Sequence, residues 1–256
     1  MTATGGTDAY DASADAWAAG PASVYGRLAE ALLDESPIPV KGAGVLDVGA
    51  GTAVVAAAAR RRGARRAVAS DVAARMLGQR SPGIPAVLGD AARLPFADGS
   101  FDLVAAGFCL SHLDAPAAAL DEWRRVAGAV VASAFAPGPP HPAKVAVDAA
   151  VEQLGFVTPE WYERLKNVSA SIEDAVALEA LLRAAGFGAV RVSRRTVDTG
   201  LDSPEDVVRW RFGMAHLAPW VAGLSEPRRQ EATAAARRAV ADLGPPAIDI
   251  LLASGR

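Results

Sequence analysis

The chain of 256 residues carries 29 acidic and 26 basic side chains, a formal net charge of −3, and 51% of its residues are hydrophobic. A chain of this length and composition can fold around a substantial apolar core. The nearly balanced charge provides no general attraction to nucleic acid or to an anionic membrane, so neither is expected as a partner. A single cysteine, Cys109, excludes an intrachain disulfide framework and a multi-cysteine metal site, and we expect no metal.

The N-terminal sequence MTATGGTDAYDASADAW is small, polar and acidic. It lacks the basic segment and the apolar core of a signal peptide. No apolar run approaches the length that a membrane-spanning helix requires. We therefore expect a soluble, cytoplasmic protein.

Five short apolar runs in the first half of the chain have the character of strands, at residues 44–48, 66–71, 84–90, 101–108 and 128–136. Alanine-rich segments of helical length separate them. The first of these segments is expected to be capped by Thr52 and to end at Gly63. Strands that are apolar on both faces and alternate with helices are typical of a parallel sheet covered on both sides. The pattern predicts a doubly wound α/β fold.

After residue 136 this alternation stops. Helices are expected at residues 143–154, 158–168, 171–188, 203–221 and 226–244, and strands at 189–200 and 247–255. These two strands would bring the sheet to seven.

The sequence VLDVGAGTA joins the first predicted strand to the first helix. Gly49 and Gly51 allow the backbone to turn tightly and to approach a ligand closely. A dinucleotide-binding turn would have a third glycine in place of Val54 and an apolar residue in place of Asp47. An acid at this position disfavours a pyrophosphate and suits a ligand that carries an ammonium group.

Two more acids follow the next two strands. Asp71 lies 20 residues after Gly51, where its carboxylate can accept both hydroxyls of a ribose. Asp90 can accept an exocyclic amine while the backbone of Ala91 meets the adenine ring. Three acids at three strand ends fit a ligand with an amine, a ribose and an adenine but no phosphate, which describes S-adenosyl-L-methionine. The alternative interpretation is that these acids only cap helices.

Four ordered segments, VLDVGAGTA, ASDVAARML, GDAARLPFADGSFDLVAAGFCLSHLDAP and LLRAAGFGAVRV, resemble the successive motifs of class I S-adenosylmethionine-dependent methyltransferases, especially their small-molecule branch. The resemblance covers about residues 10–136 and returns around 178–198, with Ala53 where the family usually has a third glycine. It implies a doubly wound, seven-stranded Rossmann-like sheet with a helical cap and lid. The cofactor-binding residues that it implies, together with the acids above, are Tyr10, Trp17, Asp47, Gly49, Ala50, Gly51, Asp71, Val72, Met76, Asp90, Ala91 and Phe108.

By the same resemblance, residues 1–256 form a single methyltransferase domain. Its expected parts are N-terminal cap helices in 1–40, a cofactor-binding core in 41–136, acceptor lid insertions in 137–170 and 203–244, and C-terminal sheet strands and a helix in 171–202 and 245–256. In the cap, the rings of Tyr10 and Trp17 are expected to face the sulfonium of the cofactor, with Tyr25 as a weaker candidate.

The acceptor side of the site is less defined by the sequence. His112, just past the fourth strand, is the candidate general base, and a structural histidine is the alternative. Five aromatic residues of the post-sheet segments either cover an apolar acceptor or pack helices together: Trp161, Tyr162, Trp210, Phe212 and Trp220.

We therefore expect methyl transfer from S-adenosyl-L-methionine to oxygen, nitrogen or carbon of a small apolar or aromatic metabolite, in specialised metabolism, by a monomer or homodimer. One alternative is an enzyme of the same fold that uses the bound cofactor for a cyclisation or decarboxylation. The sequence also leaves open an NAD-dependent oxidoreductase, which Asp47 and Val54 disfavour, and a non-catalytic binding subunit.

Overall fold

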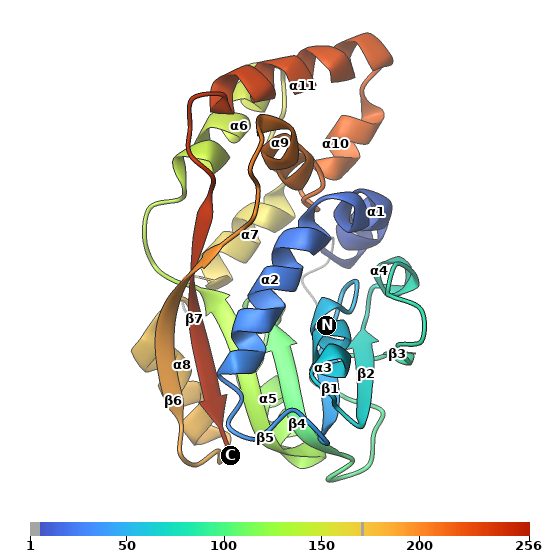
Figure 1. Cartoon of the computed structure of the whole chain (residues 1–256), viewed down its shortest axis with the longest axis vertical. Helices are drawn as coiled ribbons and strands as arrows, with labels where there is room; N and C mark the ends of the chain where they lie inside the picture. The colour runs from blue at the N-terminus through green and yellow to red at the C-terminus, as the bar shows by residue number, and fades with distance from the viewer. Residues whose placement is uncertain (1–5, 170–171) are drawn as a thin grey trace.

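The computed structural model describes residues 6–169 and 172–256, and its described residues form one seven-stranded sheet in the order β3-β2-β1-β4-β5-β7-β6 (Figure 1). The strands are β1 (Gly44–Val48), β2 (Arg66–Asp71), β3 (Ala86–Leu88), β4 (Phe101–Gly107), β5 (Ala127–Phe135), β6 (Arg191–Asp198) and β7 (Ala247–Gly255). The first five are parallel, and β7 runs antiparallel between β5 and β6. The predicted seven-stranded, doubly wound Rossmann-like sheet is confirmed.

Helices cover both faces of the sheet and extend beyond its carboxyl edge. The helices are α1 (Gly6–Ala19), α2 (Pro21–Asp34), α3 (Val54–Arg61), α4 (Ala74–Gly78), η1 (Leu110–His112), α5 (Pro116–Val126), α6 (Pro142–Glu152), α7 (Glu160–Ser169), α8 (Ala175–Ala184), α9 (Pro204–Phe212), α10 (Ala218–Gly223) and α11 (Glu226–Val240). α2 and α3 lie on one face, α5 and α8 on the other, and α6 and α9 to α11 stand beyond the strand ends (Figure 1).

Two apolar clusters form the core, one on each face of the sheet. Neighbouring residues of a strand point to opposite faces, so Val45 belongs to the cluster that contains Leu28 and Leu32 of α2, whereas Leu46 belongs to the cluster that contains Leu120 and the fully buried Trp123 of α5. This two-sided burial is the physical reason for the continuous apolar runs in the sequence.

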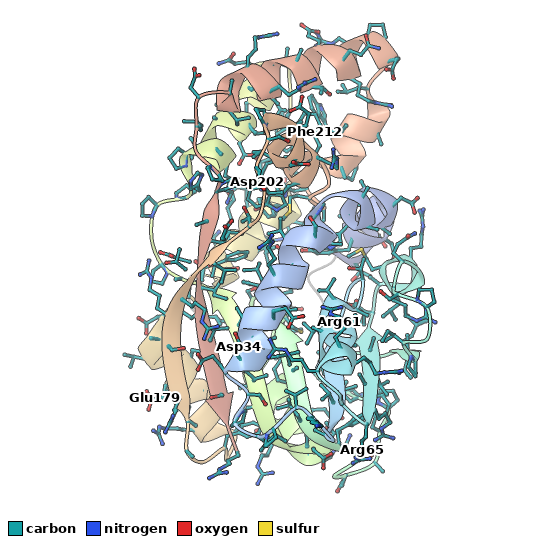
Figure 2. The ribbon with its side chains drawn as sticks, viewed as in Figure 1. Asp34, Arg61, Arg65, Glu179, Asp202 and Phe212 are labelled. Atoms are coloured by element: carbon teal, nitrogen blue, oxygen red, sulfur yellow. The ribbon has the colours of Figure 1, made fainter. Side chains whose placement is uncertain are left out.

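Ion pairs hold α2 against α3 at the surface of this layer. Glu30 accepts hydrogen bonds from Arg61 and Arg62 at 2.8 Å each, and Asp34 pairs with Arg62 at 2.9 Å. Figure 2 labels Asp34 on α2 and Arg61 on α3. Because these groups are exposed to solvent, each pair contributes only about 0–1 kcal/mol. The ion pairs therefore add little to the packing of α2, whose apolar residues belong to the core.

Some element boundaries differ from the sequence prediction. The expected cap, Thr52, does not cap α3: the helix begins at Val54, its N-cap residue is Ala53, and no cap side chain bonds its backbone. The third strand covers 86–88 where 84–90 was expected. The predicted helix 203–221 is interrupted at Gly213, where an added Cβ would lie 2.4 Å from Cδ of Pro21.

Small parts of the predicted elements fall outside the described residues. They are residues 1–5 of the cap helices, residue 170 of the first lid insertion and residue 171 of the helix predicted at 171–188.

Candidate functional site

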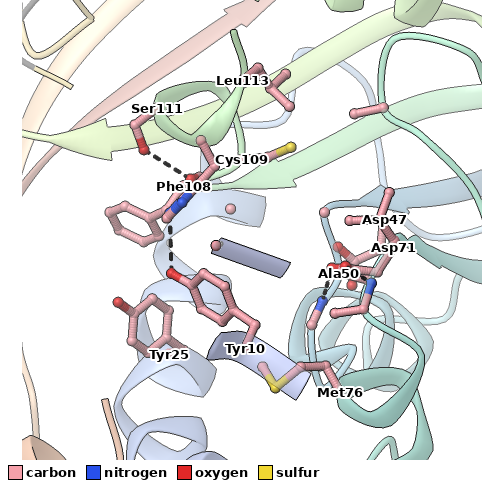
Figure 3. Close-up of a pocket in the computed structure, with 18 of the residues that line it drawn as sticks. Tyr10, Tyr25, Asp47, Ala50, Asp71, Met76, Phe108, Cys109, Ser111 and Leu113 are labelled. Carbon is pink, nitrogen blue, oxygen red and sulfur yellow. Dashed lines mark hydrogen bonds between the residues drawn. The ribbon is translucent and has the colours of Figure 1, made fainter. Parts of the chain in front are cut away.

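A cavity of about 280 Å³ opens at the carboxyl ends of the parallel strands. The chain runs from β1 to β2 and β3 in one direction and then from β4 to β5 in the other, so β1 and β4 flank the switch point where open α/β sheets bind ligands. All thirteen residues predicted for the site line this one cavity, namely Tyr10, Trp17, Asp47, Gly49, Ala50, Gly51, Asp71, Val72, Met76, Asp90, Ala91, Phe108 and His112. Figure 3 labels Tyr10, Asp47, Ala50, Asp71, Met76 and Phe108 among them.

Steric constraints favour glycine at two positions in the turn after β1. Gly49 has φ +65°, and a Cβ added there would lie 2.5 Å from Sγ of Cys109. Gly51 has φ +52°, and its added Cβ would lie 3.3 Å from Cε of Met76. Both backbones are in the left-handed region that favours glycine. Ala53 adopts the same region, with φ 59°, without being glycine.

Asp47 is buried at the base of this turn, with 1% of its surface exposed. Its Oδ2 accepts a hydrogen bond from the backbone N–H of Ala56 at 2.8 Å and so supplies the cap that α3 otherwise lacks. Its Oδ1 is enclosed and has no hydrogen-bond partner among the described residues. Burial raises the pKa of Asp47 to about 7. A buried carboxylate with one unsatisfied oxygen is costly alone, and its charge would be stabilised by a cationic ligand group, such as an ammonium, in the adjoining cavity.

Asp71 connects the end of β2 to the same turn. Its Oδ2 accepts the N–H of Gly51 at 2.7 Å, and its Oδ1 accepts the N–H of Ala73 at 2.8 Å. Burial raises the pKa of Asp71, while these backbone hydrogen bonds act in the opposite direction. Since each carboxylate oxygen has two lone pairs, the side chain retains acceptor capacity toward the cavity.

Asp90 and Ala91 form the loop after β3. Oδ1 of Asp90 accepts the N–H of Ala92 at 3.0 Å, and the carbonyl of Ala91 accepts a hydrogen bond from Nε1 of Trp123 at 3.0 Å. Trp123 is fully buried in α5, so this bond fixes the loop against the helix layer. The loop therefore has a defined position relative to the turn after β1.

The opposite end of the cavity is aromatic. Phe108 has φ 59°, which is rare for a bulky residue, and its N–H is held by the carbonyl and Oγ of Ser133 at 3.2 Å each. This backbone places the ring 4.5 Å from Phe135 and 5.5 Å from Tyr25, measured between ring centres. The strain is thus used to direct a large apolar side chain into the site.

The N-terminal helix closes over the centre of the cavity. The Tyr10 ring lies 5.6 Å from that of Trp17 and 6.2 Å from that of Trp161 in α7, and its hydroxyl lies 3.5 Å from Nε2 of His112. Burial lowers the pKa of His112 to about 4, so the imidazole is neutral at physiological pH. Neutral His112 can accept a proton within the cavity.

The aromatic residues of the two lid segments have different surroundings. Trp161 lines the cavity together with Arg164 and Leu165 of the same helix, α7. Tyr162 stacks on His216, Trp210 and Phe212 pack with the core, and Trp220 packs on Phe156; no described residue of the 203–244 segment lines the cavity.

Sequence reasoning missed three kinds of lining residue. An apolar wall of the cavity is formed by Leu28 and Leu32 of α2 and by Phe135 of β5. Cys109 also lines the cavity and packs against Gly49. Phe135 lies at the end of a predicted strand and is recognisable by the same rule as Phe108. The α2 residues carry no comparable signal, because an apolar face of a helix usually indicates core packing.

Two further observations concern the described residues. Among residues 6–169 and 172–256, no group of three or more His, Cys, Asp or Glu side chains is arranged to hold a metal ion. In the same part of the chain, no helix combines the length and apolar character needed to cross a membrane.

Comparison with known proteins gives relatives in sequence and in structure. The family described as "Methyltransferase domain" matches residues 46–129. Demethylmenaquinone methyltransferase of Beutenbergia cavernae is 31% identical over 196 residues, which are 71% of this chain and 79% of that protein. The enzyme of the same name from a Mycobacterium species is 46% identical over 83 residues, covering 32% of this chain and only 36% of the relative.

Solved structures share the fold at low identity. A putative methyltransferase from an antibiotic biosynthesis pathway of Anabaena variabilis has a TM-score of 0.65 at 15% identity, covering 90% of this chain and 96% of that one. Phosphoethanolamine N-methyltransferase 2 of Haemonchus contortus, in complex with S-adenosylhomocysteine, has a TM-score of 0.55 at 15% identity. The match covers 90% of this chain and 52% of that one. Taken with the sheet order and the strand-end site, these relatives show that the chain belongs to the class I methyltransferases, enzymes whose cofactor is S-adenosyl-L-methionine.

Proposed function

We propose that this enzyme methylates a small apolar or aromatic metabolite that binds between α2, α7 and the ends of β4 and β5. The observation that supports this acceptor class is the continuity of one cavity from three acids at strand ends to a wall of Tyr25, Phe108 and Phe135. Most of a small-molecule pocket is normally apolar, with a few polar groups that fix orientation. The curated relatives above are named for methylation of a quinone, demethylmenaquinone, which is consistent with a ring-shaped acceptor.

The residues at the strand ends fit the cofactor in chemical character. In our proposal, the buried carboxylate of Asp47 supplies negative charge beside the ammonium group, Gly49 and Gly51 provide backbone without side chains, and Asp71 accepts hydrogen bonds from the ribose. Asp90 and Ala91 are assigned to the adenine edge, and Ala50, Val72 and Met76 to the walls of the adenosine pocket. When bound, S-adenosyl-L-methionine supplies a methyl group carried by a sulfonium cation.

The residues of the chain contribute alignment, exclusion of water and charge. Tyr10 and Trp17 cover the cavity from α1, and their ring faces can stabilise a nearby cation by about 0.5–2 kcal/mol. The rings of Phe108 and Phe135 restrict the positions open to an acceptor, which favours in-line attack. Neutral His112 is the candidate acceptor of a proton from an oxygen or nitrogen nucleophile.

The decisive experiment measures both ligand binding and product. Asp71→Ala is expected to weaken S-adenosylhomocysteine binding about tenfold or more in calorimetry, because charged hydrogen bonds contribute about 1.5–3 kcal/mol. Asp98→Ala is the control, since Asp98 is exposed and lies outside the cavity. Unchanged affinity of the Asp71 variant would show that the ribose lies elsewhere.

Mass spectrometry of incubations with S-adenosyl-L-methionine and a panel of phenols, naphthols and quinols then tests the reaction. The expected product carries one added methyl group and appears together with equimolar S-adenosylhomocysteine. A product of unchanged elemental composition, formed without S-adenosylhomocysteine, would instead indicate the cyclisation alternative.

A further inference from the structure

Tyr25 occupies a distinctive position at the aromatic end of the cavity. Its ring is held between Trp17 at 5.0 Å and Phe108 at 5.5 Å, centre to centre, and it lines the cavity (Figure 3). Its hydroxyl has no hydrogen-bond partner among the described residues. The oxygen is also absent from the fully enclosed unpaired atoms, so it remains accessible to a ligand. The ring is therefore fixed while its polar group is left available.

The other hydroxyls at this end of the cavity already have partners. Ser111 donates to the carbonyl of Phe108 at 3.1 Å, Ser133 accepts from the N–H of the same residue, and Tyr10 contacts His112. The neighbouring lining residues of α2, Leu28 and Leu32, are apolar. Tyr25 is thus the side chain at this end whose hydrogen-bonding capacity the described residues leave unused.

Arg211 is a buried cation outside the lining of the cavity. Arg211 of α9 is 1% exposed; its Nη2 donates to Oδ1 of Asp148 at 2.7 Å and lies 3.4 Å from Nε2 of His216, while its Nε is enclosed without a partner among the described residues. His216 is fixed in turn by parallel stacking on Tyr162, with ring centres 3.9 Å apart. The guanidinium is therefore held rigidly, away from solvent.

The charge of Arg211 influences the hydroxyl of Tyr25. It acts to lower the pKa of Tyr25, although burial has the larger effect and raises that pKa well above its ordinary value, so the phenol stays protonated. The protonated O–H of Tyr25 is therefore a hydrogen-bond donor available to a ligand in the cavity.

We propose that Tyr25 is a specificity-determining residue that selects acceptors bearing an oxygen on the aromatic ring by donating a hydrogen bond to that oxygen. The proposal rests on the aromatic acceptor class proposed above and narrows it to phenols, quinols and ring ketones. A site built to hydrogen-bond a ligand oxygen discriminates strongly against the analogue that lacks it, because the protein group is then left unpaired.

The test compares two probes that differ by one oxygen, 1-naphthol and naphthalene, in wild type and in Tyr25→Phe. Binding is followed by tryptophan fluorescence with saturating S-adenosylhomocysteine, so the measurement does not depend on methyl transfer. Tyr162→Phe removes the same atom from a tyrosine that also lies near Arg211 but does not line the cavity, and it serves as the matched control. Thermal unfolding of both variants verifies that they are folded.

Wild type and Tyr162→Phe are expected to bind 1-naphthol about tenfold more tightly than naphthalene, and Tyr25→Phe is expected to bind the two probes equally. A preference for 1-naphthol that survives in Tyr25→Phe, or no preference in wild type, would overturn the assignment. Absence of methylated product from every acceptor would count against the proposed function alone, because the difference between the probes is measured without turnover.

Discussion

The buried carboxyl of Asp47 should make the stability of the ligand-free enzyme depend on pH. Its pKa is about 7 in the folded protein, against 3.8 for an ordinary aspartate. The folded state therefore binds a proton between these two values that the unfolded state has released, so stability falls as pH rises through this window. A difference of about 3 pKa units corresponds to roughly 4 kcal/mol, present below pH 4 and lost by pH 7.

Asp47→Asn removes this titration while keeping a side-chain oxygen that can accept the N–H of Ala56. Urea unfolding of wild type and variant, without ligand, is measured from pH 4.5 to 8.5. The free energy of unfolding of the variant, relative to that of wild type, is expected to rise by about 1.4 kcal/mol for each pH unit up to pH 7 and to stay constant above it. Asp71 also has a raised pKa but is present in both proteins, so it largely cancels in the difference. Parallel stability curves would refute the raised pKa of Asp47.

Ligand binding should change in the opposite direction. Above pH 7, the ionised carboxylate of Asp47 is available to the ammonium group of the cofactor, whereas an asparagine provides no charge. Asp47→Asn is therefore expected to bind S-adenosylhomocysteine about tenfold or more weakly at pH 8, even though the free protein is more stable. A variant that is more stable but binds with unchanged affinity would show that Asp47 acts only as the cap of α3.

Three further predictions concern the turn and the candidate base. Ala53→Gly should raise the free energy of unfolding by about 0.5–1 kcal/mol, because it relieves the strain of an alanine in the left-handed region. Ala57→Gly, inside α3, should lower the free energy of unfolding by about 1 kcal/mol in the same urea titrations. Gly49→Ala should lower stability by about 1–3 kcal/mol and abolish calorimetric binding of S-adenosylhomocysteine, because the new Cβ meets a neighbour at 2.5 Å; Gly26→Ala, which meets no atom within 4 Å, should do neither. The pKa of His112 is near 4, so its imidazole should stay neutral between pH 6 and pH 8. Any fall in kcat from pH 8 to pH 6, measured at saturating cofactor, should therefore be the same in wild type and in His112→Gln.

The parts of the fold that the sequence predicts well are those where local pattern and tertiary structure require the same thing. The strands 44–48, 66–71 and 247–255 have the bounds that the sequence predicts; the first two are largely buried and end in a turn or at an acid. The strand expected at 84–90 is shorter, since β3 lies at the sheet edge, where one side lacks a pairing strand among the described residues.

Features that depend on contacts distant in sequence are not predictable in the same way. Thr52 matches the preferred residue types of a helix cap, yet the carboxylate of Asp47 from the preceding strand supplies that hydrogen bond. The break at Gly213 is set by the close approach of Pro21 and of the carbonyl of Ala16, a contact that no pattern within residues 203–221 contains. The available hydroxyl of Tyr25 likewise depends on which neighbours are already paired.

Backbone strain is found at both ends of the cavity. Among the described residues, positive φ without glycine occurs at Ala53, Phe108 and Ala189, and the first two flank the cofactor end and the aromatic end of the cavity. Such conformations persist where surrounding groups over-determine them. Oxygens of Ser133 hold the N–H of Phe108, and Asp47 holds the first turn of the helix that follows Ala53. One oxygen of Asp47 thus fixes the strained turn while the other is enclosed without a partner, so under the proposed cofactor placement a single buried acid would couple the stability of α3 to the occupancy of the site.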